Sequence, residues 1–304
     1  MSAIEKVTAI VNGTTYTLTL NSQTGAYEAT VTAPTKSSYN QEGNYYGVTV
    51  TAKDVAGNTA TITPSDATLG ESLKLKVVEK VKPVVNFTSP TTGSGLTNNK
   101  PVFKLNLTDL DSGVDLSTFK LQIDSQTAIG IADCTYSEIT NGYAVIYTPK
   151  TAIADGSHTI TASVSDHDGN VSDTATTKIK IDTVPPTLTL SSPADKSFIN
   201  KKTCTVAGVT NDATSSPVSV TIKVGSADQG AVTVGSDGSF SKEVTLVEGA
   251  NTITITAKDS LGKTTTMTRT VTVDTAPPVF ESVTLSPNPV DAGKTYTISV
   301  KVKS

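Results

Sequence analysis

The sequence of 304 residues contains no tryptophan, two cysteines, two methionines and two histidines. About 40% of its residues are apolar when glycine is counted and tyrosine is left out, against about 45–50% in an average globular protein. This composition does not favour one large hydrophobic core. Several thin cores fit better, because a two-layer β-sandwich buries only alternate residues of each strand.

Long apolar runs and an excess of positive charge are also missing. No segment approaches the ~18 apolar residues of a membrane-spanning helix, and the first six residues lack the apolar core of a secretory signal. The formal net charge is −4, and basic residues are interspersed with acidic ones, so no basic stripe is available for phosphates. We expect no membrane span, no nucleic-acid binding and, unless the natural chain begins upstream, no secretory export.

What the sequence does contain is a repeated hairpin. The same hairpin occurs three times. In each copy a strand is followed by Ala or Val, one polar residue, Asp, a two-residue tip, Gly and a second strand. The copies are VTVTAKDVAGN (48–58), ITASVSDHDGN (160–170) and ITITAKDSLGK (253–263). Asp54, Asp166 and Asp259 of these copies are 112 and 93 residues apart, which is the length of an immunoglobulin-like sandwich. Alternate apolar residues before each Asp are expected to face inward, with Gly providing the positive φ of the tip.

Proline-containing joints separate the repeats. They are IKIDTVPP (179–186), VTVDTAPP (271–278) and the looser VVEKVKP (77–83). Proline fixes φ and removes a donor, so these linkers are expected to be short, extended and fairly stiff. The chain is therefore divided into Ig-like domains at 1–80, 81–183 and 184–276 and a partial segment at 277–304. Three sandwiches of ~35–40 Å, placed end to end, would form an all-β rod of roughly 110 Å.

The partial segment holds only two stretches with strand character, Phe280–Leu285 and Thr295–Val302. Two strands cannot close a sandwich. We therefore expect this tail to pack on the third domain, to pair with another chain by adding strands to its sheet, or to remain incompletely folded.

Side chains suited to catalysis are scarce. His158 lies two residues before an inward-facing strand, at the position of Tyr46 and Asn251 in the other repeats, where a polar group can tie the preceding loop back. His167 is expected at an exposed hairpin tip. No arrangement of nucleophile, histidine and carboxylate can be argued from them, so we predict no enzymatic activity and no catalytic or cofactor-binding residues.

The two cysteines, Cys134 and Cys204, fall in different repeats. A disulfide between them would have to join separate domains, so we expect two free, mostly buried thiols.

Acidic residues form the one constellation with metal chemistry. Two loops expected at the same end of the second domain, near the linker residue Glu79, carry Asp109, Asp111, Asp115, Asp166, Asp168 and Asn170. The equivalent set of the third domain, Asp182, Asn211, Asp212 and Asp259, is thinner.

These oxygens suit a structural Ca²⁺ ion at a joint. The alternative is turn chemistry alone, because Asp commonly bonds its local backbone and no 12-residue calcium loop is present. We assign no metal residue, and keep structural calcium as the alternative, with Asp111 and Asp168 as the pair whose replacement tests it.

Sugar recognition usually requires an aromatic platform, and Trp is absent. Tyr39, Tyr45 and Tyr46 are the nearest approach to one. A glycan site there is an alternative to the use of these tyrosines in core or corner packing.

The third repeat contains the stretches TCTVAG (203–208), GSDGSF (235–240) and VTLVEGANTITITAKD (244–259). Through these stretches it resembles the bacterial Ig-like domains of surface and phage-tail proteins. The second repeat is similar to a sister type through DSGVDLSTF (111–119) and ADGSHTI (154–160), and the first resembles it more weakly through NGTTY (12–16). The resemblance covers nearly the whole chain. It implies the fold more than the function, because the module occurs in adhesins, enzyme spacers and virion proteins alike.

With the two-strand end PNPVDAGKTYTISVKV (287–302), the repeats resemble Ig-like tail or baseplate-associated proteins of phages and prophages of Gram-positive bacteria. This resemblance implies a non-catalytic structural or adhesion protein in the virion, which decorates or extends the tail and contacts the host surface. Its partners would be other structural proteins, through residues 277–304, and surface glycans. The alternatives are a fragment of a cell-surface or secreted adhesin or stalk, and a spacer of an extracellular polysaccharide-degrading enzyme.

Overall fold

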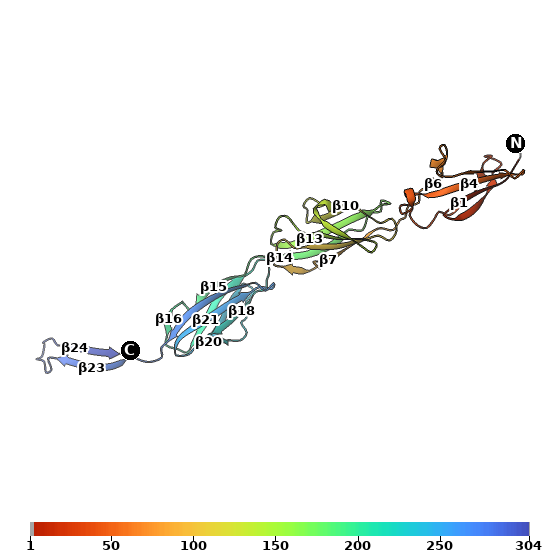
Figure 1. Ribbon diagram of the computed structural model, residues 1–304. Coiled ribbons are helices and arrows are strands. Elements are labelled where there is room, and N and C mark those ends of the chain that lie inside the picture. The colour runs from red at the N-terminus through yellow and green to blue at the C-terminus, as the bar shows by residue number, and fades with distance from the viewer. Residues whose placement is uncertain (1–2, 304) are drawn as a thin grey trace. The chain divides into compact units, whose positions relative to one another are not determined.

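The computed structural model describes residues 3–303, in which the regular structure is almost entirely β (Figure 1). Three short 3-10 helices interrupt the strands of this range: η1 (Glu42–Asn44), η2 (Gly70–Leu73) and η3 (Ile131–Asp133). Met1, Ser2 and Ser304 lie outside the described residues. The chain forms two compact units, which meet in sequence between Ile181 and Asp182. No helix in residues 3–303 is long and apolar enough to cross a membrane.

The first domain is a single antiparallel sheet. Its strands are β1 (Ile4–Val11), β2 (Thr14–Leu20), β3 (Tyr27–Glu28), β4 (Tyr46–Asp54), β5 (Thr59–Ile62) and β6 (Lys74–Leu75). The order is β3-β2-β1-β4-β5, with β6 paired to β4. Val48, Val50 and Ala52 are only half-buried, as are the threonines between them. The clear inward and outward alternation predicted for this strand is therefore wrong, because no second sheet covers one face of β4.

The second domain is a sandwich of two four-stranded sheets. Its strands are β7 (Val84–Ser89), β8 (Ser94–Leu96), β9 (Phe103–Thr108), β10 (Val114–Ile123), β11 (Thr135–Ile139), β12 (Gly142–Tyr147), β13 (Gly156–Asp166) and β14 (Ala175–Ile181). One sheet has the order β10-β13-β14-β8 and the other β11-β12-β9-β7. Ile160, Ala162 and Val164 are buried between them, as their alternation predicts.

The third domain is a sandwich of the same kind, with sheets of three and five strands in place of four and four. Its strands are β15 (Thr187–Ser192), β16 (Ser197–Ile199), β17 (Thr203–Asn211), β18 (Ser219–Val224), β19 (Ala227–Asp228), β20 (Ser239–Thr245), β21 (Gly249–Lys258) and β22 (Thr264–Val273). The sheets run β15-β17-β20 and β16-β22-β21-β18-β19, so β15, β17 and β21 take the places of β7, β9 and β13. Ile253, Ile255 and Ala257 are buried as predicted. Tandem immunoglobulin-like sandwiches, the fold expected from the repeat, are confirmed in these two domains.

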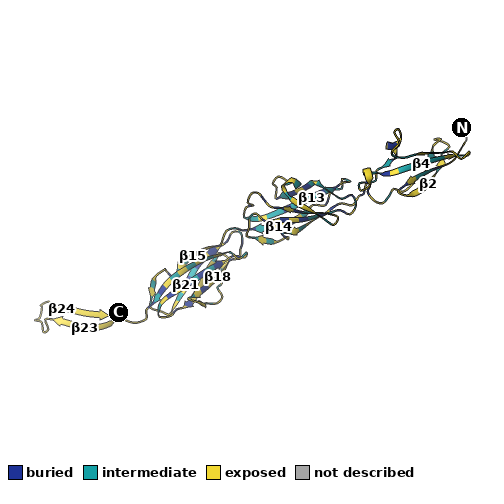
Figure 2. Cartoon of the chain, viewed as in Figure 1, coloured by how far each residue is buried: buried dark blue, intermediate teal, exposed yellow. Residues whose placement is uncertain are grey.

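The last described residues form a two-stranded hairpin of β23 (Val279–Ser286) and β24 (Thr297–Lys303). The antiparallel register places Val283 opposite Val300 and Leu285 opposite Ile298, so one face of the hairpin is apolar. Every residue of both strands is exposed, which Figure 2 shows in yellow. The two strands predicted here are present, and no layer formed by residues 3–303 buries their apolar face.

Candidate functional site

Two groups of buried carboxylates occupy the same three topological positions in the two sandwiches. The first acidic triad is Glu79, Asp109 and Asp166, and the second acidic triad is Asp182, Asp212 and Asp259. In each triad one acid precedes the first strand of the sandwich, one directly follows β9 or β17, and one lies at the end of β13 or just after β21. All six residues are buried, and in each triad three carboxylate oxygens, one from each residue, lie within 4.8 Å of one another.

Local turn geometry positions Asp109 in the first acidic triad. Its Oδ1 accepts the backbone N–H groups of Asp111 (3.0 Å) and Gly113 (2.7 Å), which fixes the carboxylate at the end of β9. Gly113 has a φ of 83°, a left-handed conformation in which a side chain would be strained. The turn therefore directs the second oxygen of Asp109, Oδ2, into the interior.

The other two acids of this triad share an amide. Asn170 donates its backbone N–H to Asp166 Oδ1 (2.8 Å), and its side-chain Nδ2 donates to Asp166 Oδ2 (2.7 Å) and to the Glu79 carbonyl (3.1 Å). The Glu79 carboxylate also accepts the Val81 backbone N–H and the Ser112 hydroxyl. These bonds hold the linker that enters the second domain against its last hairpin.

The second acidic triad is built in the same way. Asp212 Oδ1 accepts the backbone N–H groups of Thr214 (2.8 Å) and Ser215 (2.6 Å), and the Ser215 hydroxyl donates to Asp182 Oδ2. Asp259 Oδ1 accepts the N–H groups of Leu261 (2.8 Å) and Lys263 (2.9 Å). Lys263 occupies the position of Asn170 and has no amide, so the second oxygen of Asp259 receives no matching bond.

One buried oxygen of each triad is left without a hydrogen-bond partner. These oxygens are Asp109 Oδ2 and Asp259 Oδ2, on residues that are 7% and 5% exposed. Buried carboxylate oxygens normally have a partner, because leaving one unpaired in the interior costs free energy. Both oxygens are on members of the triads, in which three carboxylates lie close together.

Among the described residues, no positive side chain forms an ion pair with a triad. Within residues 3–303 the ion pairs of Lys and His involve other carboxylates, and none reaches a member of either triad. Two unit charges 4.8 Å apart repel each other by about 3–4 kcal/mol at an effective dielectric constant of 20. Burial raises the pKa of the Glu79 carboxyl, and the adjacent carboxyls of Asp166 and Asp109 raise it further. Chemically, the triads are sets of hard oxygen donors suited to a cation.

The sequence located these loops correctly but did not identify every inward-facing acid. Asp111 accepts the Ser37 backbone N–H (3.1 Å), and Asp168 accepts that of Glu79 (2.9 Å), so the pair chosen to test calcium lies outside the triad. Asp115 lies within β10, where its Oδ1 accepts the backbone N–H (3.0 Å) and the hydroxyl (2.6 Å) of Ser117. In the third domain Asn211 is an exposed strand residue and does not join the acids. The other three residues of the set predicted there, Asp182, Asp212 and Asp259, form the second acidic triad.

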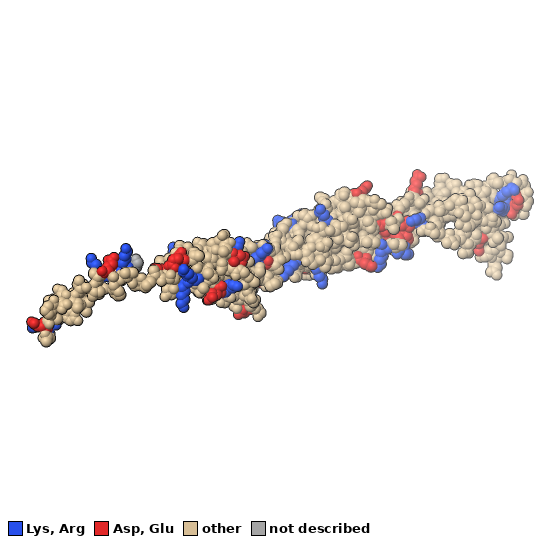
Figure 3. Space-filling view, turned by 90° about the horizontal axis from the view of Figure 1, so that it is seen from below, with Lys and Arg blue, Asp and Glu red and all other residues tan. Residues whose placement is uncertain are grey.

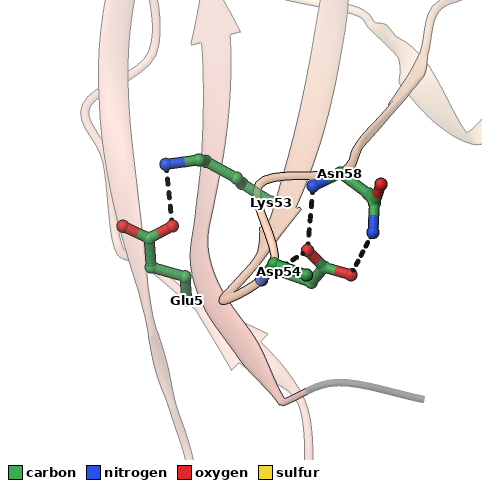
Figure 4. Close-up of polar contacts among 5 residues, drawn as sticks. Glu5, Lys53, Asp54 and Asn58 are labelled. Atoms are coloured by element: carbon green, nitrogen blue, oxygen red, sulfur yellow. Dashed lines mark hydrogen bonds and ion pairs between the residues drawn. The ribbon is translucent and has the colours of Figure 1, made fainter.

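The first domain shows the same hairpin without a triad. Asp54 Oδ1 accepts the N–H of Asn58 (2.8 Å), and Asp54 Oδ2 accepts its Nδ2 (2.9 Å), as Asp166 does with Asn170 (Figure 4). A salt bridge between Lys53 and Glu5 (2.8 Å) lies beside it. Strands equivalent to β7 and β9 are absent from residues 3–80, so no loop carries a counterpart of Asp109.

The loop-tying role predicted for three equivalent positions is confirmed. His158 contacts the Ala154 carbonyl (2.8 Å) and the Asp124 carboxylate (2.7 Å). The Asn251 side chain bonds both the N–H and the carbonyl of Val247, and the Tyr46 hydroxyl donates to the Lys36 carbonyl. These polar residues are structural.

The tyrosines expected as an alternative glycan platform have separate partners. Tyr39 stacks on His167 with ring centroids 4.0 Å apart, Tyr45 lies under the Lys74 ammonium, and Tyr46 is buried. His167 is exposed, as predicted, but it is covered on one ring face.

On the face of the molecule shown in Figure 3, basic and acidic side chains are interspersed.

The two cysteines are free, as predicted, and half-buried rather than mostly buried. Burial raises the pKa of the Cys134 thiol to about 11 and also raises that of Cys204. Both thiols are therefore poor nucleophiles at neutral pH.

The two sandwiches match known domain families. Residues 88–183 match the model described as a bacterial Ig-like domain, and residues 186–275 match the model described as glucodextranase domain B. Bacillopeptidase F of Bacillus subtilis (strain 168) is 30% identical over 128 residues, which make up 42% of this chain. The match covers 8% of the length of that relative.

Solved structures of tandem β domains are similar at low identity. Fibronectin(III)-like modules of Clostridium thermocellum CbhA are 18% identical with a TM-score of 0.35, covering 63% of this chain and 94% of theirs. A tetra-tandem repeat in the extending region of a large adhesion protein is 17% identical with a TM-score of 0.34, covering 98% and 79%. TM-scores this low carry no argument about function. The strand topology and the family matches fit a non-catalytic spacer or adhesion module.

Proposed function

We propose that this chain is a non-catalytic structural module of a larger particle, a phage tail or a related assembly, which its Ig-like domains decorate or extend toward the host surface. The observation that carries the proposal is the exposed hairpin of β23 and β24. Two strands alone are marginally stable in water, and a sheet with one apolar face is normally covered by a second layer. Pairing with the sheet of another structural subunit would provide that cover.

The chemistry of the hairpin supports addition to a neighbouring sheet. Val283, Leu285, Ile298 and Val300 form its apolar face, and all four are 44–59% exposed. Both outer edges of the hairpin present unpaired backbone groups, which can add to another sheet through main-chain hydrogen bonds. Contact with surface glycans of the host is the second interaction that we propose for the decorated particle.

Immunogold electron microscopy tests this function directly. Antibodies against the third domain are applied to intact cells of the producing bacterium and to the particles released after prophage induction. Label on tails or related particles, lost when residues 277–304 are deleted, is the expected result. Label on intact cell walls, as an adhesin or stalk requires, or a gene product whose further strands complete the hairpin into a sandwich, would contradict the proposal.

A spacer of an extracellular polysaccharide-degrading enzyme is the second candidate. The match of residues 186–275 to glucodextranase domain B favours it, because that family is named after an enzyme. Sequencing the complete gene discriminates the two candidates. A catalytic domain in the same reading frame supports the spacer. Its absence excludes the spacer and leaves the particle module and the cell-surface adhesin, which the immunogold experiment separates.

A further inference from the structure

The two acidic triads coincide in position although their domains match different family models. The linker acids, Glu79 and Asp182, each lie five residues before the first strand of a sandwich. The other acids follow the same strands in both domains, and their Oδ1 atoms accept backbone N–H groups of the adjoining turn or hairpin. Turn chemistry explains these Oδ1 atoms. It does not explain why a third acid from the linker joins each pair.

The two unpartnered oxygens distinguish the triads from ordinary turns. In the first domain both oxygens of Asp54 are hydrogen-bonded in the same hairpin. Asp109 and Asp259 instead each leave a buried Oδ2 without a donor, and this oxygen lies on an acid that converges with two others. A buried anion at such a point requires a proton or a cation. The described Lys, Arg and His side chains do not provide one, because none of them forms an ion pair with a triad carboxylate.

From this geometry we infer that each acidic triad is a calcium-binding site, which ties the linker preceding the domain to two loops of the domain it enters. Ca²⁺ lies about 2.3–2.6 Å from its oxygen ligands, so ligand oxygens on opposite sides of the ion are about 4.6–5.2 Å apart. The 4.8 Å limit within each triad is compatible with this span. Three carboxylates carry three negative charges, and one Ca²⁺ ion reduces that charge to −1.

Calcium fits these triads better than magnesium. The oxygens come from a linker, a loop and a hairpin end, and Ca²⁺ accepts 6–8 oxygens in flexible geometry. Mg²⁺ demands near-octahedral geometry at about 2.0–2.1 Å and gives up its water reluctantly. The inference does not depend on which assembly contains the chain.

Isothermal titration calorimetry of the whole chain with CaCl₂ tests the inference, with Asp109→Asn and Asp259→Asn as variants. Asparagine keeps the Oδ1 that caps the turn and replaces only the unpartnered oxygen, so both variants are expected to fold. The parent should bind two Ca²⁺ ions, each single variant one, and the double variant none. Asp54→Asn, at the equivalent hairpin position of the first domain, is the matched control and should still bind two.

Thermal unfolding provides the second readout. Ca²⁺ should raise the melting temperature of the parent above its value in EDTA, while equal ionic strength from NaCl should not, and Mg²⁺ should raise it less. In EDTA, Asp109→Asn and Asp259→Asn should melt at or above the parent temperature, because each removes a repelling charge.

Four results would overturn the calcium assignment. The first is no binding up to about 10 mM Ca²⁺, a concentration above the ~10⁻³ M dissociation constant of weak extracellular calcium modules. The second is two binding sites that persist in the double variant. The third and fourth are a rise in melting temperature with Mg²⁺ or with NaCl that equals the rise with Ca²⁺. If either variant fails to fold, Glu79→Gln and Asp182→Asn address the same sites from the linkers, and binding unchanged in both would also overturn it.

Discussion

Polar side chains at the sites described above are held by hydrogen bonds to nearby backbone, and Cys134 follows the same pattern, with its Sγ donating to the Gly130 carbonyl at 3.6 Å. Because burial raises the pKa of the Cys134 thiol from 9.0 to about 11, its thiolate fraction at pH 8 falls roughly 100-fold. We predict that both thiols react far more slowly with a disulfide reagent in the folded chain than in denaturant. A native thiol that reacts at the rate of free cysteine would contradict this prediction.

Asn251 should contribute to stability through the loop that it holds. Its side chain is buried and bonds the backbone of Val247 and Gly249. Asn251→Ala should lower the unfolding free energy of the third domain by about 1–3 kcal/mol, because it leaves these groups unsatisfied. Chemical denaturation measures the change, with the exposed neighbour substitution Thr252→Ala as control. Equal effects of the two substitutions would show that the loop is held by other contacts.

At the residue scale, the sequence predicts which loops carry acids but not which acids turn inward. Asp109 and Asp111 are two positions apart and equally suited to a turn. Asp109 caps the turn with one oxygen and sends the other inside, whereas Asp111 bonds Ser37 of the first domain. That difference depends on the turn conformation at Gly113 and on contacts 74 residues apart in sequence. Neither can be derived from spacing alone.

At the scale of strands and hairpins, alternation predicts the inner face where two sheets meet and is misleading where one sheet stands alone. Ile255 is fully buried in the third sandwich, while Val50 has the same pattern in the first domain and is half-buried. A strand pattern indicates which face is apolar. It does not indicate whether another sheet covers that face, because the covering strands are distant in sequence.

This difference predicts unequal sensitivity to truncation. Ile255→Ala should destabilise the third domain by about 2–5 kcal/mol, the usual cost of a cavity in a packed core. Val50→Ala should cost clearly less in the first domain, because its side chain contributes less buried area. Denaturant midpoints of the two variants measure the effects. A larger loss for Val50→Ala would mean that the first domain has a core as tight as the third.

The hairpin of β23 and β24 should be dispensable for the folding of its neighbour. All residues of its two strands are exposed, so deletion of 277–304 should remove little buried area from the third sandwich. The unfolding transition of the third domain should keep its midpoint in the shortened chain. A midpoint that falls on deletion would show that the hairpin packs on this domain, and would remove the basis for strand addition to a separate subunit.

At the scale of the whole chain, each sandwich is entered by a linker whose acid completes a triad with two loops of that sandwich. The repeat spacing and the proline joints predicted the two-sheet domains and the end at which the acids gather. The single-sheet first domain and the completeness of the second acidic triad required the three-dimensional arrangement. We propose that the chain is a structural module in which calcium fastens each linker to the domain that follows.

Anomalous X-ray diffraction from crystals of the whole chain grown in CaCl₂ would locate calcium at the two acidic triads. Two anomalous peaks are predicted, one in each acidic triad, each about 2.3–2.6 Å from oxygens of all three carboxylates and in contact with Asp109 Oδ2 or Asp259 Oδ2. Triads that contain no peak, with calcium only at exposed carboxylates, would contradict calcium binding at the acidic triads.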